Sequence, residues 1–262
     1  MGTASPSFWL DAAILEWTPE FLSGIGQQRP RFLRPHQILD HAYRLLADDP
    51  EPFVLADVLS NLKRAVNSRL QHFEEIYCLA STFPKAVGAL ERLEGVGLAK
   101  PFLIRELFEL RNDVEHKDAT PPSQQRCGEL ADTTWYFLKT TDYPCKTAVS
   151  GVTLRCESGP YARDPNLWLS AQLQSESSTE IFLNGWLPVP LLHTKPLPGS
   201  LPLAIRKQRS KTSLQYSDGT PVSTAGIASH AERGDDERYV DATVVATDAL
   251  KRKLWTLAFQ SL

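Results

Sequence analysis

The long run from Phe53 to Ser81, which contains neither proline nor glycine, restricts the fold of this chain more than any other feature. Its apolar residues recur every three or four positions, as Val54, Val58, Leu62, Val66, Leu70, Phe73 and Tyr77. That spacing puts them on one side of an α-helix, and the run is far too long for a strand. The sequence therefore predicts one long amphipathic helix that needs partners along its apolar face.

Shorter helical segments follow at 85–97, 100–116 and 124–142, and Ser123 is the expected N-cap of the last. In the segment 100–116, the residues expected to share one buried face are Leu103, Leu107, Leu110 and Val114. Residues 36–142 are thus predicted to form an all-helical bundle of four or five helices. Residues 1–35 are assigned to an N-terminal extension.

Residues 143–262 have a different texture, with apolar residues alternating in short steps between turn signals such as those at 158–160 and 217–219. Strand-like runs occupy 152–156, 167–174, 179–187, 213–220, 238–247 and 253–262. Pro188–Pro202 is expected to be an extended linker, and 217–236 a polar loop. The predicted fold class is α+β, with the helical bundle followed by a mostly antiparallel β domain of unknown function.

Composition and charge exclude several classes of protein. With 42% hydrophobic and 23% charged residues, the chain is typical of packed soluble proteins, and its net charge of −3 gives no global attraction to nucleic acid. The four cysteines form no CxxC pair, and the six histidines do not lie near them at metal-ligand spacing, so structural zinc is not expected. No other metal and no cofactor is expected. The N-terminus lacks the pattern of a secretion signal, and no run approaches the roughly 20 apolar residues of a membrane span. We expect a cytoplasmic protein that does not enter a membrane.

The stretch ELRNDVEHKD, residues 109–118, places an arginine, an asparagine and a histidine at the polar end of a core helix. Residues five apart on a helix are rotated by about 140°, so Arg111 and His116 are not expected to share a face. Asn112 and His116 are four apart, so the amide can orient the imidazole. Glu115 stands in the same relation to Arg111 and is expected to hold the guanidinium.

These residue types suit cleavage of RNA without a metal ion. Histidine can transfer the proton of the 2′-hydroxyl or of the leaving oxygen, at a typical gain of about 10²–10⁴-fold. Arginine can donate two parallel hydrogen bonds to phosphate oxygens and so stabilise the charge on the phosphate. The motif therefore fits ribonuclease chemistry, although arginine and histidine also occur at this spacing in unrelated helices.

The segment RNDVEH, residues 111–116, resembles the R-x4-6-H motif of the HEPN superfamily, and its setting within a helical bundle over 36–142 agrees. The resemblance implies a metal-independent endoribonuclease that cleaves RNA by 2′-hydroxyl attack. Arg111 and His116 would be the catalytic pair, and Asn112 the supporting polar residue of the catalytic set. The supporting role of Glu115 rests on its spacing from Arg111 and not on the resemblance. It also implies a homodimer in which both motifs line one cleft, and a role in a toxin or anti-phage defence system. The β-rich remainder would then sense a trigger or bind a regulatory protein partner.

Two other interpretations remain open on the sequence. The charged end of 100–116 is also typical of a solvated helix terminus, and a HEPN-like module can serve protein–protein interaction or regulation without catalysis. The basic runs Arg206–Lys211 and Lys251–Lys253 could touch RNA phosphates, but solvated strand edges are the favoured interpretation of both.

Overall fold

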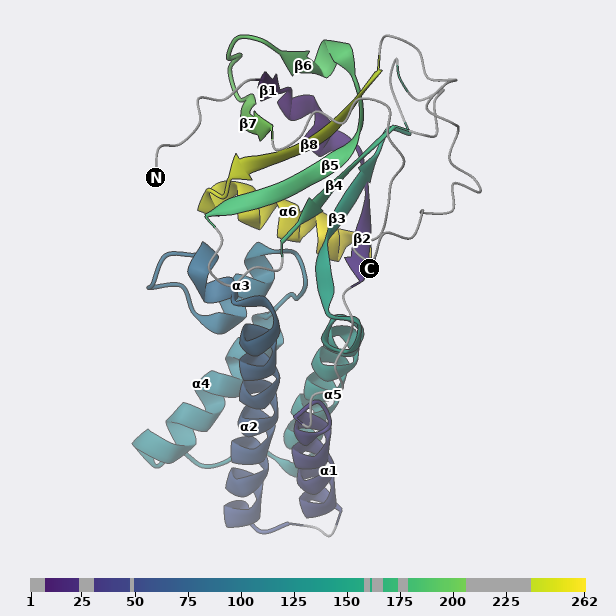
Figure 1. Cartoon of the computed structure of the whole chain (residues 1–262). Helices are drawn as coiled ribbons and strands as arrows, with labels where there is room; N and C mark the ends of the chain where they lie inside the picture. Colours follow the sequence, from purple (N-terminus) through teal and green to yellow (C-terminus); the bar gives the residue numbers. More distant parts are fainter. Residues whose placement is uncertain are drawn as a thin grey trace, which may run out of the picture. The chain divides into compact units, whose positions relative to one another are not determined.

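The computed structural model divides the chain into two compact units, a helical unit over residues 23–149 and a β unit formed by residues 1–22 and 150–261 (Figure 1). The described residues are 8–23, 31–47, 50–157, 161, 167–173, 179–205 and 237–262. The fold class is α+β, with a helical region over about 34–147, an eight-stranded antiparallel sheet and a C-terminal helix in the described part.

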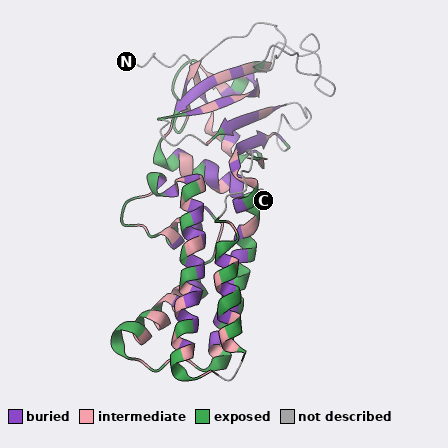
Figure 2. Cartoon of the chain, turned by 60° about the horizontal axis from the view of Figure 1, so that its bottom comes forward, coloured by how far each residue is buried: buried purple, intermediate pink, exposed green. Residues whose placement is uncertain are grey.

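The helical unit contains the predicted long helix, and other helices of the unit pack against it. Its elements are α1 (Arg34–Leu46), α2 (Pro52–Tyr77), the 3-10 helix η2 (Leu79–Thr82), α3 (Ala89–Gly95), α4 (Phe102–Lys117) and α5 (Gln124–Thr147). Helices α1, α4 and α5 all contact α2, and α4 also contacts α5. The long helices carry buried residues along one side and exposed residues along the other (Figure 2).

Local sequence explains where these helices begin and end. Pro52 occupies the first turn of α2, where its missing N–H costs nothing, and Cys78 ends the helix in a left-handed conformation with φ of 48°. At the start of α5 the Ser123 hydroxyl accepts a hydrogen bond from the Arg126 backbone N–H, as the sequence predicts.

Helix α4 buries a different face from the one that the sequence suggests. Ile104 and Leu107 are 3% and 1% exposed, whereas Leu103 remains 45% exposed. Leu107 belongs both to the predicted apolar face with Leu103 and to a second face with Ile104. The packing of α4 against both α2 and α5 buries the face that contains Ile104. The prediction of a buried Leu103 is therefore wrong. The rotation matters for function, because one turn beyond Leu107 the buried side of α4 continues into Arg111.

A buried ion pair joins α2 to α5. The Arg69 side chain is fully buried, and its Nη2 donates to Asp142 Oδ1 at 2.6 Å. His36 of α1 places its Nε2 2.8 Å from the same oxygen. Arg69 also donates to the carbonyl of Thr141 at 3.4 Å, and its guanidinium lies 5.1 Å from the ring centre of Phe32. One carboxylate thus fixes the register of three helices.

The described residues of the β unit form an antiparallel sheet in the order β2-β3-β4-β5-β8-β7-β1-β6, together with the C-terminal helix α6. Its strands are β1 (Phe8–Leu10), β2 (Thr18–Ser23), β3 (Val149–Arg155), β4 (Trp168–Gln172), β5 (Glu180–Pro188), β6 (Leu192–His193), β7 (Leu201–Ile205) and β8 (Glu237–Val245). The remaining elements are the 3-10 helices η1 (Ala12–Glu16) and η3 (Val189–Leu191), and α6 (Asp248–Gln260).

Two strands from the N-terminal part of the chain, β1 and β2, belong to this sheet. The sequence assigns 1–35 to an extension, but β1 lies between β7 and β6, and β2 forms the edge beside β3. The segment expected to be an extended linker also contributes, because β6 pairs with β1 through Leu192 and Leu10. These pairings join residues far apart in the chain, so no local sequence pattern predicts them.

Residues 248–260 form helix α6, which corrects the expectation of a strand over 253–262. The N-cap of α6 is Thr247, whose hydroxyl oxygen accepts a hydrogen bond from the Leu250 backbone N–H. The buried residues of α6 recur with a helical period, as Leu250, Leu254, Trp255, Leu257, Ala258 and Phe259. The aromatic and leucine content of this run suggested a strand, whereas its spacing is helical.

Several sequence expectations lie outside the described residues. They are the strand at 213–220, the polar loop at 217–236, the basic run Arg206–Lys211 and the turn at 158–160.

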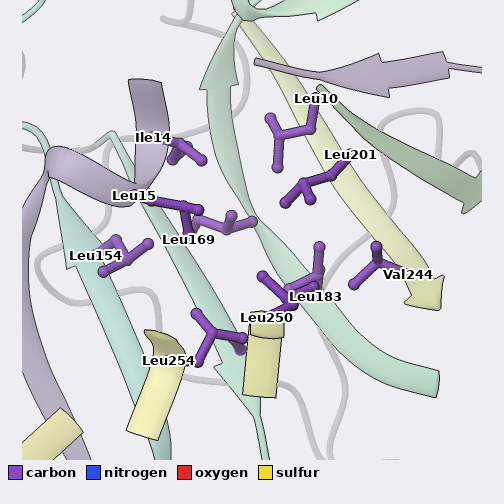
Figure 3. A pocket seen from close by; sticks show the side chains of 11 residues that line it. Leu10, Ile14, Leu15, Leu154, Leu169, Leu183, Leu201, Val244, Leu250 and Leu254 are labelled. Atoms are coloured by element: carbon purple, nitrogen blue, oxygen red, sulfur yellow. The ribbon is translucent and has the colours of Figure 1, made fainter. Parts of the chain in front are cut away.

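The core of the β unit is an apolar layer between the sheet and the segments η1 and α6. Figure 3 shows side chains from β1, η1, β3, β4, β5, β7, β8 and α6 converging on one point. The void between them is about 10 Å³ and its lining is entirely apolar. A space of this size has room for about one water molecule and offers it no hydrogen-bond partner. It is a packing defect of a dry core, not a ligand site.

Strands β4 and β5 lie so close at Gly185 that no side chain fits between them. A Cβ built on Gly185 would lie 2.0 Å from the carbonyl oxygen of Trp168, so Gly185→Ala should lower the free energy of unfolding by about 1–3 kcal/mol. Gly128→Ala on α5 is the control, because nothing lies within 4 Å of its added Cβ. That variant should be neutral or up to about 1 kcal/mol more stable. Chemical denaturation measures both, and equal stabilities for the two variants would contradict the strand spacing.

The buried ion pair of Arg69 with Asp142 should contribute strongly to the stability of the helical unit. Asp142→Ala leaves the fully buried Arg69 without its carboxylate, and should lower the free energy of unfolding by about 3–5 kcal/mol. Asp132→Ala is the matched control, because Asp132 lies on the same helix but is exposed and bonds only to Tyr43 among the described residues. A loss of less than about 1.5 kcal/mol is expected for the control. Similar losses in the two variants would show that the pair does not hold the helices together.

Candidate functional site

The residues of the RNDVEH motif occupy the last two turns of α4. The helix ends after Lys117, and Asp118 takes a left-handed conformation with φ of 50°, its N–H bonded to the carbonyl of Asp113. The motif therefore lies on regular helix up to its end, and the helical period decides which of its side chains meet α2.

Arg111 lies near Lys63 of α2, and its hydrogen-bonding partners come from α4 itself. Its side chain is 24% exposed, and its guanidinium forms an ion pair with Glu115 one turn further on, as the sequence predicts. A second, longer contact of 3.5 Å joins Arg111 Nη1 to Asn112 Oδ1. Arg111 Nε is buried and has no hydrogen-bond partner among the described residues. The guanidinium is thus fixed in place without having all its donors satisfied.

Helix α2 supplies two further polar side chains to this cluster. Ser60 donates from its hydroxyl to Glu115 Oε1 at 3.0 Å, and Lys63 donates from Nζ to Asn112 Oδ1 at 2.8 Å. The Lys63 ammonium also lies 5.3 Å from the ring centre of Phe108. We define the α2–α4 cluster as Ser60, Lys63, Arg111, Asn112 and Glu115.

Sequence reasoning missed Ser60 and Lys63. They sit three residues apart on α2, outside its apolar stripe, where polar residues are ordinary. Only the packing of α4 against α2 shows that they face the motif.

The α2–α4 cluster carries more positive than negative charge. Burial lowers the pKa of Lys63, the neighbouring Arg111 guanidinium lowers it further, and Glu115 acts in the opposite direction. Two cations therefore share a single carboxylate, and that carboxylate already accepts bonds from both Ser60 and Arg111. An anion placed beside Lys63 and Arg111 would relieve the repulsion between them.

His116 lies on another side of α4. It is exposed and lines a shallow surface hollow together with Glu109, Asn112, Asp113 and Lys117. Asp113 and Lys117 neutralise one another through an ion pair of 2.7 Å. Asn112 and His116 share this face as predicted, but the expected hydrogen bond between them is absent from the described contacts. No contact between Arg111 and His116 is present in the described part of the chain either.

Asn112 is the residue that connects the two halves of the motif. Its side-chain oxygen accepts from Lys63 within the α2–α4 cluster, while its side chain also borders the hollow that contains His116. A ligand that reaches from Lys63 and Arg111 across Asn112 would meet the imidazole at the next turn.

Among the described residues, no three histidine, cysteine, aspartate or glutamate side chains come together in a group able to hold a metal ion. None of the described helices combines the length and the apolar character required to cross a bilayer.

The chain was compared with known proteins in three ways. No protein-family model, no curated protein and no solved structure matches it.

Chemically, the site combines a fixed guanidinium, a second cation and an imidazole within two turns of one helix and the facing turn of another. The cations can bind the oxygens of a phosphodiester, and the imidazole can transfer a proton near neutral pH. The arrangement in a single chain keeps the guanidinium and the imidazole on different faces.

Proposed function

We propose that the helical unit is a metal-independent endoribonuclease of HEPN type, with Arg111 and His116 as its catalytic pair. The observation that carries the proposal is the excess of positive charge at Lys63 and Arg111 beside Asn112, with an exposed histidine one helical turn beyond Asn112. Cleavage of an RNA phosphodiester can use such a combination, because charge on the phosphate oxygens is present in the ground state and increases in the transition state.

In the proposed reaction His116 takes the proton of a ribose 2′-hydroxyl, and the 2′ oxygen attacks the adjacent phosphorus. The bond between phosphorus and the 5′ oxygen breaks, and that oxygen takes up a proton from solvent. The products are a 2′,3′-cyclic phosphate and a 5′-hydroxyl end. Arg111 stabilises the charge on the non-bridging oxygens, and Glu115 holds its guanidinium in position.

The divergence of Arg111 and His116 within one chain favours a homodimer as the active form. Two copies related by a twofold axis can bring the Arg111 of one close to the His116 of the other, so that two motifs complete one cleft. The exposure of His116 leaves it accessible to such a partner. We extend the proposal to a toxin or anti-phage defence role in the cytoplasm, in which the β unit binds a trigger or a regulatory protein.

A second candidate function is a noncatalytic helical module that binds another protein. The observation that favours it is the exposed aromatic surface of α5, where Trp135, Tyr136 and Tyr143 are 40%, 65% and 50% exposed. Aromatic side chains of this kind are enriched at protein interfaces. In that case the ion pair of Arg111 with Glu115 has only a structural role.

Cleavage of RNA in the presence of EDTA distinguishes the two functions. The wild-type protein should cut single-stranded RNA and leave 2′,3′-cyclic phosphate ends. Arg111→Ala and His116→Ala should each lose about 100-fold or more in rate, because one removes the charge stabilisation and the other the proton transfer. Arg64→Ala is the control, since Arg64 is exposed on α2 and donates to Asn61 rather than to a residue of α4.

Equal cutting by all four proteins would remove Arg111 and His116 from the mechanism. A panel of RNAs left intact by the wild type, together with binding of a protein partner that survives His116→Ala, would support the noncatalytic module instead.

A further inference from the structure

Lys63 is the cation of the α2–α4 cluster that the motif itself does not contain. It comes from the middle of α2, and its ammonium reaches α4 between the ring of Phe108 and the amide of Asn112. The aliphatic part of a lysine can lie along apolar surface while the charge stays accessible to water, and Lys63 is half-buried in this way.

The ammonium of Lys63 has donors left for a ligand. Among the described residues it makes one hydrogen bond, to Asn112 Oδ1, so two of its three N–H groups remain. Its acceptor is a neutral amide rather than a carboxylate. Glu115, the acidic residue of the cluster, already accepts from Ser60 through Oε1 and from Arg111 through Oε2.

The position of Lys63 is also unfavourable for a purely structural lysine. Burial and the adjacent guanidinium both oppose its charge, as the lowered pKa indicates. A lysine needed only to orient Asn112 would not require a second cation beside it. An anionic ligand that contacts both cations would turn this repulsion into attraction.

We propose that Lys63 binds a phosphate of single-stranded RNA next to Arg111, and so sets the affinity of the site for its substrate. This inference rests on the proposed function, because it names the residue that holds the substrate of the same site. Lys63 binds a non-bridging oxygen, donates through Nζ and takes no part in proton transfer. The hydrogen bond from Lys63 to Asn112 keeps that phosphate on the side of α4 from which the RNA strand can reach His116.

The test compares wild type with Lys63→Met and Lys63→Arg. Methionine keeps an unbranched chain over Phe108 but removes the charge, whereas arginine keeps the charge. Arg64→Met is the matched control, because Arg64 is the next residue on α2, is exposed and donates to Asn61 rather than to α4. Circular dichroism establishes that all four proteins are folded before binding is measured.

The binding probe is a 2′-O-methyl RNA oligomer, which keeps every phosphate but cannot be cleaved by 2′-hydroxyl attack. Fluorescence anisotropy at several salt concentrations should show Lys63→Met weakened roughly three- to tenfold, with a salt slope smaller by about 0.7, the loss of one phosphate contact. Lys63→Arg and Arg64→Met should stay within about twofold of wild type. With cleavable RNA, Lys63→Met should raise KM while kcat stays within about twofold.

Unchanged affinity and salt slope in Lys63→Met would overturn the inference, as would a wild type that does not bind the oligomer. Cleavage by the wild type together with unaltered binding by Lys63→Met would leave the proposed nuclease standing and reject Lys63 alone. Weakened binding by Lys63→Met in a protein that never cleaves RNA would support the phosphate contact and reject the nuclease.

Discussion

The packing of α2 is the constraint on which the helical unit depends. Its apolar stripe is covered by α1, α4 and α5, and the buried pair of Arg69 with Asp142 fixes how α2 meets α5. A charge buried this deeply permits little sliding, because any shift in register would separate the guanidinium from its carboxylate. The face of α2 that meets α4 is thereby fixed as well, and it presents Ser60 and Lys63 to the motif.

The charge of the candidate site is a local property that the net charge of −3 conceals. Lys63 and Arg111 lie beside one carboxylate, while the hollow around His116 is bordered by the acidic Glu109 and by the mutually neutralised pair of Asp113 and Lys117. A phosphate is therefore attracted to the side of α4 that meets α2, and not to the histidine itself. This asymmetry suits a division of tasks in which the cations hold the phosphate and the imidazole moves the proton.

Much of the helical unit could be predicted from sequence, because its signals are local. The stripe of α2 and the Ser123 cap of α5 each depend on residues within a few turns of one another. The buried face of α4 could not be predicted, since two overlapping apolar series compete and only contact with α2 and α5 selects the one that contains Ile104. The strands before residue 24 pair with segments more than a hundred residues away along the chain. The aromatic and leucine-rich composition of α6 favours a strand, although the spacing of its buried residues is helical.

The same distinction applies to the candidate site. Arg111, Asn112, Glu115 and His116 stand in one short motif, and their spacing alone predicts both the ion pair and the divergence of arginine from histidine. Lys63 belongs to a helix whose relation to the motif exists only in three dimensions. Its polar side chain lies outside the apolar stripe, so the sequence gives no reason to prefer it over other exposed lysines.

In the proposed enzyme, Lys63, Arg111 and His116 all contact the same bound RNA strand. Nuclear magnetic resonance tests this shared contact directly, by titrating the wild-type protein with the 2′-O-methyl RNA oligomer while the side-chain signals of these three residues are followed. We expect all three sets of signals to shift along one saturation curve. Signals that keep their free positions while the oligomer binds elsewhere on the protein would contradict the account.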